Sequence, residues 1–296
     1  MYKGFPKELV NILKCPKCAG RLSAFSEGSH ILEGEALCQK CASRYQIREG
    51  ILSLLEGQGI KDELLLSEIK ARDADAFRYD GKFSQRFYKE VLPTKKALGE
   101  TKGKNIIEYG SGTGRFTEIF SKEADFYLAT DFSLVSLKIT AKKIESVKVG
   151  LVLADSITLK TEESFFDAAL SLQLIEHIPT IKQREVFFEN IKSTLKSGAP
   201  FISSTYHQDL RRILKKEVKT GKHAGGIFFY NFSVAELRAE IGKYFKIIKA
   251  HPIDIALPFE IRLGFSPKVG GLIEALAERS PILNKFGHLV LVKAVK

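Results

Sequence analysis

Residues 106–114 read Ile-Ile-Glu-Tyr-Gly-Ser-Gly-Thr-Gly, and this stretch decides the fold. A short apolar strand runs directly into a glycine-rich loop, and a helical pattern resumes at residues 115–120. Glycines at alternate positions let the backbone turn tightly and approach a ligand closely, because no Cβ intervenes. Neither the lysine nor the Ser/Thr pair of a diphosphate-binding P-loop follows, so the sequence excludes that motif.

A lone acidic residue, Asp131, ends the next apolar run. Asp131 lies 21 residues after Gly110. In a doubly wound sheet the second strand ends at about this distance from the glycine loop, and a carboxylate there accepts hydrogen bonds from ribose hydroxyls. Ligands of such sheets bind outside the carboxyl ends of the strands. The residues that we expect around a cofactor at those ends are Glu108, Gly110, Ser111, Gly112, Gly114, Asp131, Phe132, Asp155, Ser156 and Gln173.

Apolar strand patterns and helical patterns alternate from residue 105 onward, which predicts a mostly parallel sheet covered on both faces. The chain of 296 residues is long enough for one large α/β domain and a small appendage. The predicted strands cover residues 105–109, 126–130, 147–153, 166–172, 199–205, 245–255 and 289–295. The predicted helices cover residues 114–122, 134–144, 181–195 and 234–243. The fold class is therefore α/β, with a doubly wound, seven-stranded, Rossmann-like sheet.

The glycine loop with Asp131 resembles the S-adenosylmethionine site of class I methyltransferases. Three more blocks follow in the family's order: residues 151–156, 166–179 and 195–204. The resemblance covers roughly residues 75–250 and implies an S-adenosylmethionine-dependent methyltransferase. It places Asp131 at the ribose, Asp155 near the adenine amino group, and the 173–177 turn over the methyl donor. A dinucleotide dehydrogenase and an inactive fold are the weaker alternatives.

Methyl transfer requires alignment of nucleophile, methyl and sulfur, and a base when the nucleophile carries a proton. His177 is the candidate base because its ordinary pKa lies near neutrality, although in many relatives the equivalent residue is architectural. Tyr206 and His207 follow the fifth strand and are further candidates. A catalytic metal at Glu176, His177 and His207 is disfavoured, because Gln173 stands where metal-dependent relatives have a carboxylate.

Cys15-Pro-Lys-Cys18 and Cys38-Gln-Lys-Cys41 are two C-x2-C knuckles separated by 19 residues. Two such knuckles complete a closed tetrahedral site, so we expect one structural Zn²⁺ at Cys15, Cys18, Cys38 and Cys41. Between them, residues 22–25 and 30–37 are predicted to form a hairpin. So small a unit depends on the metal for much of its stability.

The flanks of the knuckles, residues 13–22 and 45–55, resemble the small zinc-ribbon activator of tRNA, rRNA and protein methyltransferases. They also resemble the zinc-ribbon heads fused to many methyltransferases. In that family the ribbon is non-catalytic. We therefore expect a zinc ribbon at 1–57, a linker and helical lid at 58–104, and a methyltransferase domain at 105–296. Tyr79 is the lid residue expected to face the cofactor, and two inserts are expected at 207–232 and 256–287.

The net charge of +11 is concentrated outside the nucleotide-binding core. Residues 107–206 carry 11 basic and 13 acidic residues, whereas residues 207–223 carry six basic and two acidic ones. Apolar residues at helical spacing run through 209–218, so this segment is predicted to be a basic amphipathic helix. Such a helix packs on its own domain, lies on an anionic membrane, or holds phosphates.

We favour a small-molecule or lipid-like acceptor, methylated on oxygen or carbon, because two apolar inserts adjoin the predicted pocket. The alternatives are an RNA methyltransferase that uses the ribbon and the basic helix 207–223, and a non-catalytic partner subunit. No Asn-Pro-Pro-Tyr-like tetrapeptide follows the fourth strand, which argues against adenine, guanine or amide nitrogen as acceptor. A cytoplasmic location is expected, since no signal-peptide core or membrane-length apolar run is present. Neither the acceptor atom nor the oligomeric state follows from the sequence.

Overall fold

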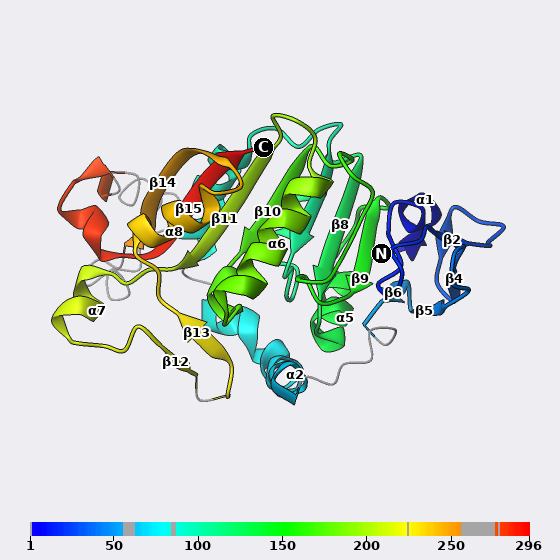
Figure 1. Cartoon of the computed structure of the whole chain (residues 1–296), viewed down its shortest axis with the longest axis horizontal. Helices are drawn as coiled ribbons and strands as arrows, with labels where there is room; N and C mark the ends of the chain where they lie inside the picture. The colour runs from blue at the N-terminus through cyan, green and yellow to red at the C-terminus, as the bar shows by residue number, and fades with distance from the viewer. Residues whose placement is uncertain (1, 56–62, 84–86, 224, 256–275, 278) are drawn as a thin grey trace.

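The computed structural model describes residues 2–55, 63–83, 87–223, 225–255, 276–277 and 279–296 (Figure 1). Within the described helices, the side chains of residues 63–64, 78–83 and 87–88 are outside the description. Among the described helices, none is both long enough and apolar enough to cross a membrane.

One large sheet runs through the molecule and organises it (Figure 1). In spatial order its strands are β14 (Lys246–Ile255), β15 (Gly287–Val295), β11 (Pro200–Tyr206), β10 (Ala168–Leu172), β7 (Asn105–Tyr109), β8 (Phe126–Asp131), β9 (Val149–Leu153), β6 (Ile51–Ser53), β5 (Arg44–Arg48), β4 (Gly34–Cys38) and β2 (Leu22–Ala24). Strands β11 through β6 in this order are parallel, and β15 is antiparallel to β11. The predicted α/β fold with a mostly parallel sheet is confirmed.

The sheet differs from the prediction in its extent. All seven predicted strands form, but the sheet continues beyond β9 into the zinc-ribbon segment. Strand β6 pairs in parallel with β9, with Leu52 opposite Val152. This pairing satisfies the backbone groups of an otherwise exposed sheet edge. Phe5 and Leu9 of the ribbon pack onto the same edge, at Gly150, where they approach the position of an added Cβ to 3.1 and 2.8 Å.

Helices cover both faces of the sheet, as the doubly wound pattern requires. One face is covered by α6 (Ile181–Thr194) and α8 (Val234–Ile241), which bury Phe187 and Leu237. The opposite face is covered by α3 (Phe87–Leu98), α4 (Thr117–Phe120) and α5 (Leu134–Lys143), which bury Val91, Phe120 and Leu137. The sheet thus lies between two separate hydrophobic cores.

Side-chain caps set where these helices begin. The predicted capping box is present: the Ser233 hydroxyl accepts from the Glu236 backbone N–H, and the Glu236 carboxylate accepts from the Ser233 N–H. Thr180 and Gln183 form a second one at α6. Each box satisfies amide groups that the first helical turn leaves without partners.

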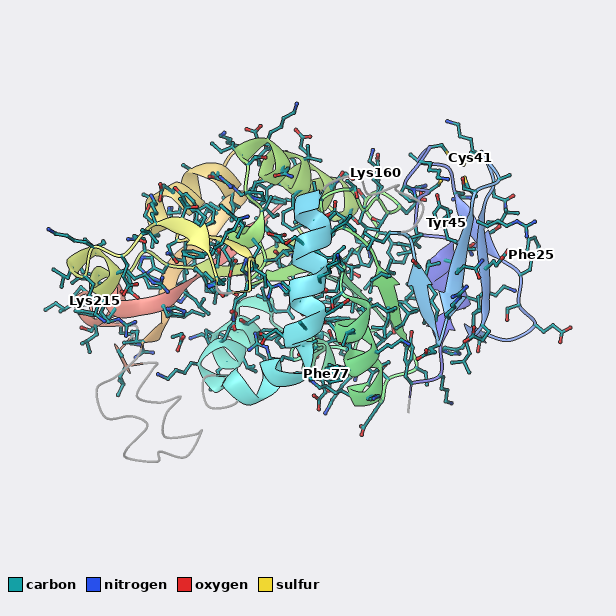
Figure 2. All side chains as sticks on the ribbon, turned by 90° about the horizontal axis from the view of Figure 1, so that it is seen from below. Phe25, Cys41, Tyr45, Phe77, Lys160 and Lys215 are labelled. Atoms are coloured by element: carbon teal, nitrogen blue, oxygen red, sulfur yellow. The ribbon has the colours of Figure 1, made fainter. Side chains whose placement is uncertain are left out.

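Helix α2 (Glu63–Phe83) lies across the carboxyl ends of the parallel strands, where it contacts α5 (Figures 1 and 2). The predicted lid region is therefore helical and placed over the site. The side chain of Tyr79 is outside the described residues, so its contact with the cofactor stays a prediction.

The first insert is less helical than predicted. Helix α7 spans only Leu210–Leu214, because Lys216 has a left-handed backbone (φ +55°) that ends the helix. A hairpin of β12 (Thr220–Lys222) and β13 (Phe228–Tyr230) follows. Most of the second insert, residues 256–275, is outside the described residues. Its end forms the 3-10 helix η3 (Leu283–Phe286), which contacts α7.

The ribbon is built from short regular elements. They are β1 (Phe5–Pro6), α1 (Lys7–Val10) and β3 (His30–Ile31), in addition to β2, β4, β5 and β6. The predicted hairpin forms with β2 antiparallel to β4. The predicted boundary at residue 57 falls among residues outside the description, so the three-part domain division stays a prediction.

Candidate functional site

The four cysteines converge at the tips of the ribbon loops. Their Sγ atoms all lie within 4.8 Å of one another, with 3.7 Å between those of Cys15 and Cys41 and 3.4 Å between those of Cys18 and Cys38. A tetrahedral zinc with Zn–S bonds of about 2.3 Å places its sulfurs about 3.8 Å apart. The described thiols therefore fit one zinc ion.

The surroundings of the thiols also suit thiolates. The Tyr45 hydroxyl lies 3.0 Å from Cys15 Sγ, and the Lys40 amide donates to Cys38 Sγ at 3.4 Å. Ala19 and Ala42, which follow the two knuckles, share a left-handed backbone (φ +56°) and bond back to the first cysteine of each pair. The two knuckles are thus equivalent turns. The Tyr45 hydroxyl and the Lys40 amide are outer-shell groups, which in metal sites orient the ligands.

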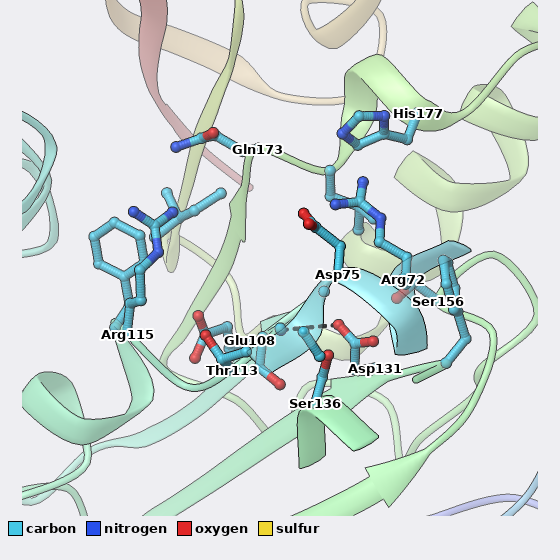
Figure 3. Close-up of a pocket in the computed structure, with 18 of the residues that line it drawn as sticks. Arg72, Asp75, Glu108, Thr113, Arg115, Asp131, Ser136, Ser156, Gln173 and His177 are labelled. Carbon is cyan, nitrogen blue, oxygen red and sulfur yellow. Dashed lines mark hydrogen bonds between the residues drawn. The ribbon is translucent and has the colours of Figure 1, made fainter. Parts of the chain in front are cut away.

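The main cavity opens at the carboxyl ends of β7, β8 and β10, beneath α2 (Figure 3). Its walls bring together most of the predicted cofactor residues. Those that line it are Glu108, Gly110, Ser111, Gly112, Asp131, Phe132, Ser156, Gln173 and His177. An adjoining cavity is lined by Asp155, Ser156, Phe132 and His177. Gly114 is not among the lining residues of the described cavities.

Gly112 and Gly114 are required for different structural reasons. Gly112 (φ +54°) has no atom within 4 Å of an added Cβ, so its backbone faces open space that a ligand can occupy. Gly114 (φ +79°) instead packs against α5, where an added Cβ would lie 2.6 Å from Thr140 Cγ2. Gly112 therefore gives access to the cavity, whereas Gly114 allows the loop to pack.

Asp131 holds the glycine loop as well as facing the cavity. Its two carboxylate oxygens accept from the backbone N–H groups of Gly112 and Ser133, each at 2.8 Å. Burial raises the pKa of Asp131, and these two hydrogen bonds lower it. Each carboxylate oxygen has two lone pairs, so both oxygens keep acceptor capacity for a pair of ribose hydroxyls.

Glu108 is buried behind the loop. It accepts hydrogen bonds from the Thr117 hydroxyl (2.6 Å) and the Tyr127 hydroxyl (2.8 Å). Burial raises the pKa of Glu108 to about 7, against the lowering effect of these donors. The residue that precedes the glycines is thus fixed in position and titrates near neutrality.

Asp155 lines a cavity and also caps a turn. It lines the adjoining cavity, and its carboxylate also caps the following turn by accepting from the Ile157 N–H at 2.9 Å. Ser156 and Phe132 line both cavities. This end of the site combines apolar side chains with the carboxylates of Asp155 and Glu68, which suits an adenine ring with its amino group.

Helix α2 adds charged side chains that the sequence did not single out. Glu68, Arg72 and Asp75 line the main cavity from above (Figure 3). The lid is tied to the site, because the Phe228 N–H of β13 donates to Glu68 at 3.3 Å and the Ser133 hydroxyl donates to Asp73 at 2.5 Å.

A second cavity adjoins the first at Arg115 and Gln173 and extends toward β14 and β15. It is lined by Glu90, Arg115, Gln173, Tyr206, Asp254, His288 and Leu289. Glu90 accepts from the Gln173 amide and the Ser204 hydroxyl, both at 2.5 Å, and lies 3.8 Å from the Arg115 guanidinium. Burial raises the pKa of Glu90 above its ordinary value, despite Arg115 and the two donors.

Two residues lining this second cavity have an uncommon backbone. Gln173 and Asp254 are non-glycine residues with φ +56°. A side chain in this left-handed region costs energy and persists where the surroundings impose it, often at functional sites. Two hydrogen bonds hold Gln173 there: its backbone N–H donates to the Ser204 carbonyl, and its side-chain amide donates to Glu90.

Two of the three candidate catalytic residues meet at the junction of the cavities. The rings of His177 and Tyr206 lie 5.7 Å apart, edge to face. Nδ1 of His177 donates to the Phe228 carbonyl at 2.6 Å, and burial lowers its pKa well below the usual value. A neutral ring with a proton on Nδ1 leaves Nε2 as an acceptor.

His207, in contrast, turns away from this junction. Its Nδ1 bonds to the Gly287 carbonyl at 2.7 Å, and it is not among the lining residues of the described cavities. Its predicted catalytic role stays a prediction with no support from this placement. Sequence reasoning missed Glu90, Arg115, Asp254 and His288, and only Arg115, next to Gly114, had a signal by position.

The comparisons with known proteins agree with this geometry. Residues 107–203 match the family described as a methyltransferase domain, and residues 7–50 match the Trm112p-like proteins. The chain thus contains a methyltransferase domain and an N-terminal Trm112p-like domain. The predicted methyltransferase class with a fused zinc-ribbon domain is confirmed.

Two curated relatives match parts of the chain. A ribosomal RNA small subunit methyltransferase A of Phytoplasma australiense is 27% identical over 117 residues, or 38% of this chain and 40% of the relative. A tRNA (carboxymethyluridine(34)-5-O)-methyltransferase of Arabidopsis thaliana is 29% identical over 96 residues, or 32% of this chain and 22% of the relative. The chain therefore spans less than half the length of the curated relatives it matches.

A solved complex between the Haloferax volcanii Trm112 methyltransferase activator and a protein described as a methyltransferase is also similar. The match has a TM-score of 0.56 at 15% identity and covers 80% of this chain and 99% of that chain. At this identity the similarity shows the fold alone.

Proposed function

We propose that this protein transfers a methyl group from S-adenosylmethionine to a small-molecule or lipid-like acceptor held in the second cavity. The observation that carries the proposal is that a cavity with a buried carboxylate, Glu90, adjoins the cofactor cavity through Gln173 and Arg115. The acceptor is methylated on oxygen or carbon.

The residues of the main cavity fit the cofactor. Asp131 has acceptor capacity for the ribose, Gly112 leaves room above its backbone, and Ser111 Oγ is buried with no partner among the described residues. Phe132, Asp155 and Ser156 would hold the adenine end. When bound, S-adenosylmethionine supplies an electrophilic methyl group on a sulfonium.

The acceptor's proton needs a base, and two groups can take it. Glu90 lines the second cavity, and burial raises its pKa toward the range in which it accepts a proton. His177 has Nε2 as its acceptor, because the Phe228 carbonyl holds the proton on Nδ1. Tyr206, whose ring contacts His177, would position the acceptor between them.

An RNA acceptor is the second candidate, and the two curated relatives named as RNA methyltransferases and the Trm112p-like domain favour it. The basic insert 207–223 supports an RNA acceptor less than its sequence predicted. Arg211 donates to the Phe286 carbonyl, Arg212 lies 3.8 Å from Glu217, and Lys219 pairs with Glu236. Half of the six basic side chains are thus engaged within the protein.

The acceptor class is tested with methyl-labelled S-adenosylmethionine and two fractions of one cell extract, small molecules with lipids and total RNA. Label is expected in the first fraction. Label that enters RNA instead would overturn the proposal and establish the second candidate.

The base is tested by comparing Glu90→Gln and His177→Asn with Glu118→Gln, an exposed glutamate of α4. Loss of a general base costs about 10²–10⁴-fold in rate, so we expect kcat to fall by about 100-fold or more in Glu90→Gln with unchanged cofactor affinity. Wild-type kcat in both Glu90→Gln and His177→Asn would show that neither group takes the proton.

A further inference from the structure

The end of the molecule opposite the ribbon carries exposed apolar side chains that the active site does not use. They lie on α7, which Figure 1 shows at the end opposite the ribbon, with the residues that follow it, and on the residues before and within η3, which contacts α7. Ile213, Leu214, Val218, Ile282 and Leu283 are 55, 71, 67, 69 and 40% exposed. We name these five residues the apolar tip.

The two segments of the apolar tip are held next to each other. Arg211 of α7 donates to the Phe286 carbonyl at 2.8 Å, and Arg212 lies 3.3 Å from Nδ1 of His288. The side chains of both arginines thus hold α7 against the end of η3 and the start of β15. The apolar stripe seen in the sequence is therefore only partly explained by packing, because Ile213 and Leu214 face solvent.

Among the described residues, the exposed charges around the apolar tip are mostly positive. Lys215, Lys216 and Lys285 are exposed, whereas Asp209 is buried as the cap of α7. Glu217 is the one exposed acid between residues 209 and 223, and it lies beside Arg212. Apolar side chains flanked by lysines are the pattern of elements that insert into the headgroup region of an anionic membrane.

From these observations we infer that the apolar tip docks the protein on an anionic lipid surface. Its apolar side chains would enter the boundary between headgroups and acyl chains, while Lys215, Lys216 and Lys285 meet anionic headgroups. An RNA surface fits less well, since it would leave five exposed apolar side chains without a partner. The charge complementarity and the apolar side chains together favour a lipid bilayer.

The position of the apolar tip matters for the acceptor. His288, which contacts Arg212, also lines the second cavity. A lipid surface under the apolar tip would therefore lie next to the acceptor end of the site. This inference rests on the proposed function only in its location of the acceptor, because membrane docking itself needs no methyl transfer.

Co-sedimentation with vesicles tests the inference on the full chain. Wild type should sediment with vesicles of phosphatidylcholine mixed with phosphatidylserine, and much less with phosphatidylcholine alone. The variants Ile213→Ser/Leu214→Ser and Lys215→Glu/Lys216→Glu should each weaken this binding about tenfold or more. Phe25→Ser/Leu32→Ser, which changes two exposed apolar residues of the ribbon, should bind as wild type does.

Cofactor affinity by calorimetry serves as the folding control, and it should be the same in all variants. Failure of wild type to bind anionic vesicles, or wild-type binding by both tip variants, would overturn the inference. Binding of RNA in place of vesicles, lost in the lysine variant, would overturn it as well. None of these outcomes measures methyl transfer, so a failure here is distinguishable from a failure of the proposed function.

Discussion

The two ends of the large sheet differ in how their sites are built. At the ribbon end, four thiols from two knuckles meet, and Cys15 and Cys41 are only 26 residues apart. At the acceptor end, Glu90 bonds Ser204 across 114 residues and Gln173 across 83. The first site depends on local turns, whereas the second depends on the correct assembly of the whole sheet.

This difference explains which site could be found from the sequence. A knuckle has a fixed spacing because a tight turn places its two sulfurs, so the pattern is visible in the chain. A buried carboxylate such as Glu90 has no local pattern, because its partners come from β10 and β11. The ribbon end is therefore expected to depend on its metal, and the acceptor end on its buried polar groups.

The largest expected effect is at the ribbon end. Cys38→Ser should remove the zinc and destabilise the ribbon, because structural zinc contributes about 10–16 kcal/mol to small zinc-binding units. Elemental analysis of protein purified without added metal should find one zinc per chain in wild type and far less in the variant. Asp131→Ala should keep its zinc. A wild-type protein without zinc and with fully reactive thiols would contradict the metal assignment.

Between the two ends, at the carboxyl edge of the central strands, Asp131→Ala should weaken S-adenosylmethionine binding by about a hundredfold or more. Two charge-assisted ribose hydrogen bonds of about 1.5–3 kcal/mol each would be lost, together with the acceptor of the Gly112 N–H. Calorimetry measures the affinity, and Cys38→Ser protein that still folds should bind nearly as well as wild type. Equal affinity in wild type and Asp131→Ala would refute the ribose assignment.

A pH-dependent effect sharpens the account of the buried groups. Glu176 is buried, its Oε2 accepts from Thr205 at 2.8 Å, and burial raises its pKa from 4.5 to about 8. The folded protein therefore keeps Glu176 protonated between these pH values, while the unfolded chain ionises it. The wild-type free energy of unfolding should fall as pH rises through this window, by about 1.4 kcal/mol per pH unit.

Glu176→Gln removes this titration and keeps the other groups. The stability of the variant relative to wild type should rise from about pH 5 to about pH 8 and level off above that. Urea unfolding at a series of pH values measures the difference. A constant difference across this range would show that Glu176 is ionised in the folded protein.

Much of the fold could be predicted because its signals are local. Apolar runs and helical patterns located the seven strands and four helices of the methyltransferase domain within a few residues, and Ser233 with Glu236 marked the start of α8. The 207–223 segment was predicted less well. Its helix ends at Leu214. Arg211, Arg212 and Lys219 bind Phe286, His288 and Glu236, which lie far along the chain, so the local helical pattern could not reveal these contacts.

By itself, the sequence determined the glycine loop with Asp131, the two cysteine knuckles and the positions of the strands along the chain, because each depends on neighbouring residues and backbone geometry. Only the tertiary structure decided that β6 joins β9 into one sheet, that Glu90 meets Gln173 and Arg115, and that Ile213 and Leu214 stay in solvent. These outcomes depend on burial and on pairing between distant segments, and burial is a property of the assembled chain.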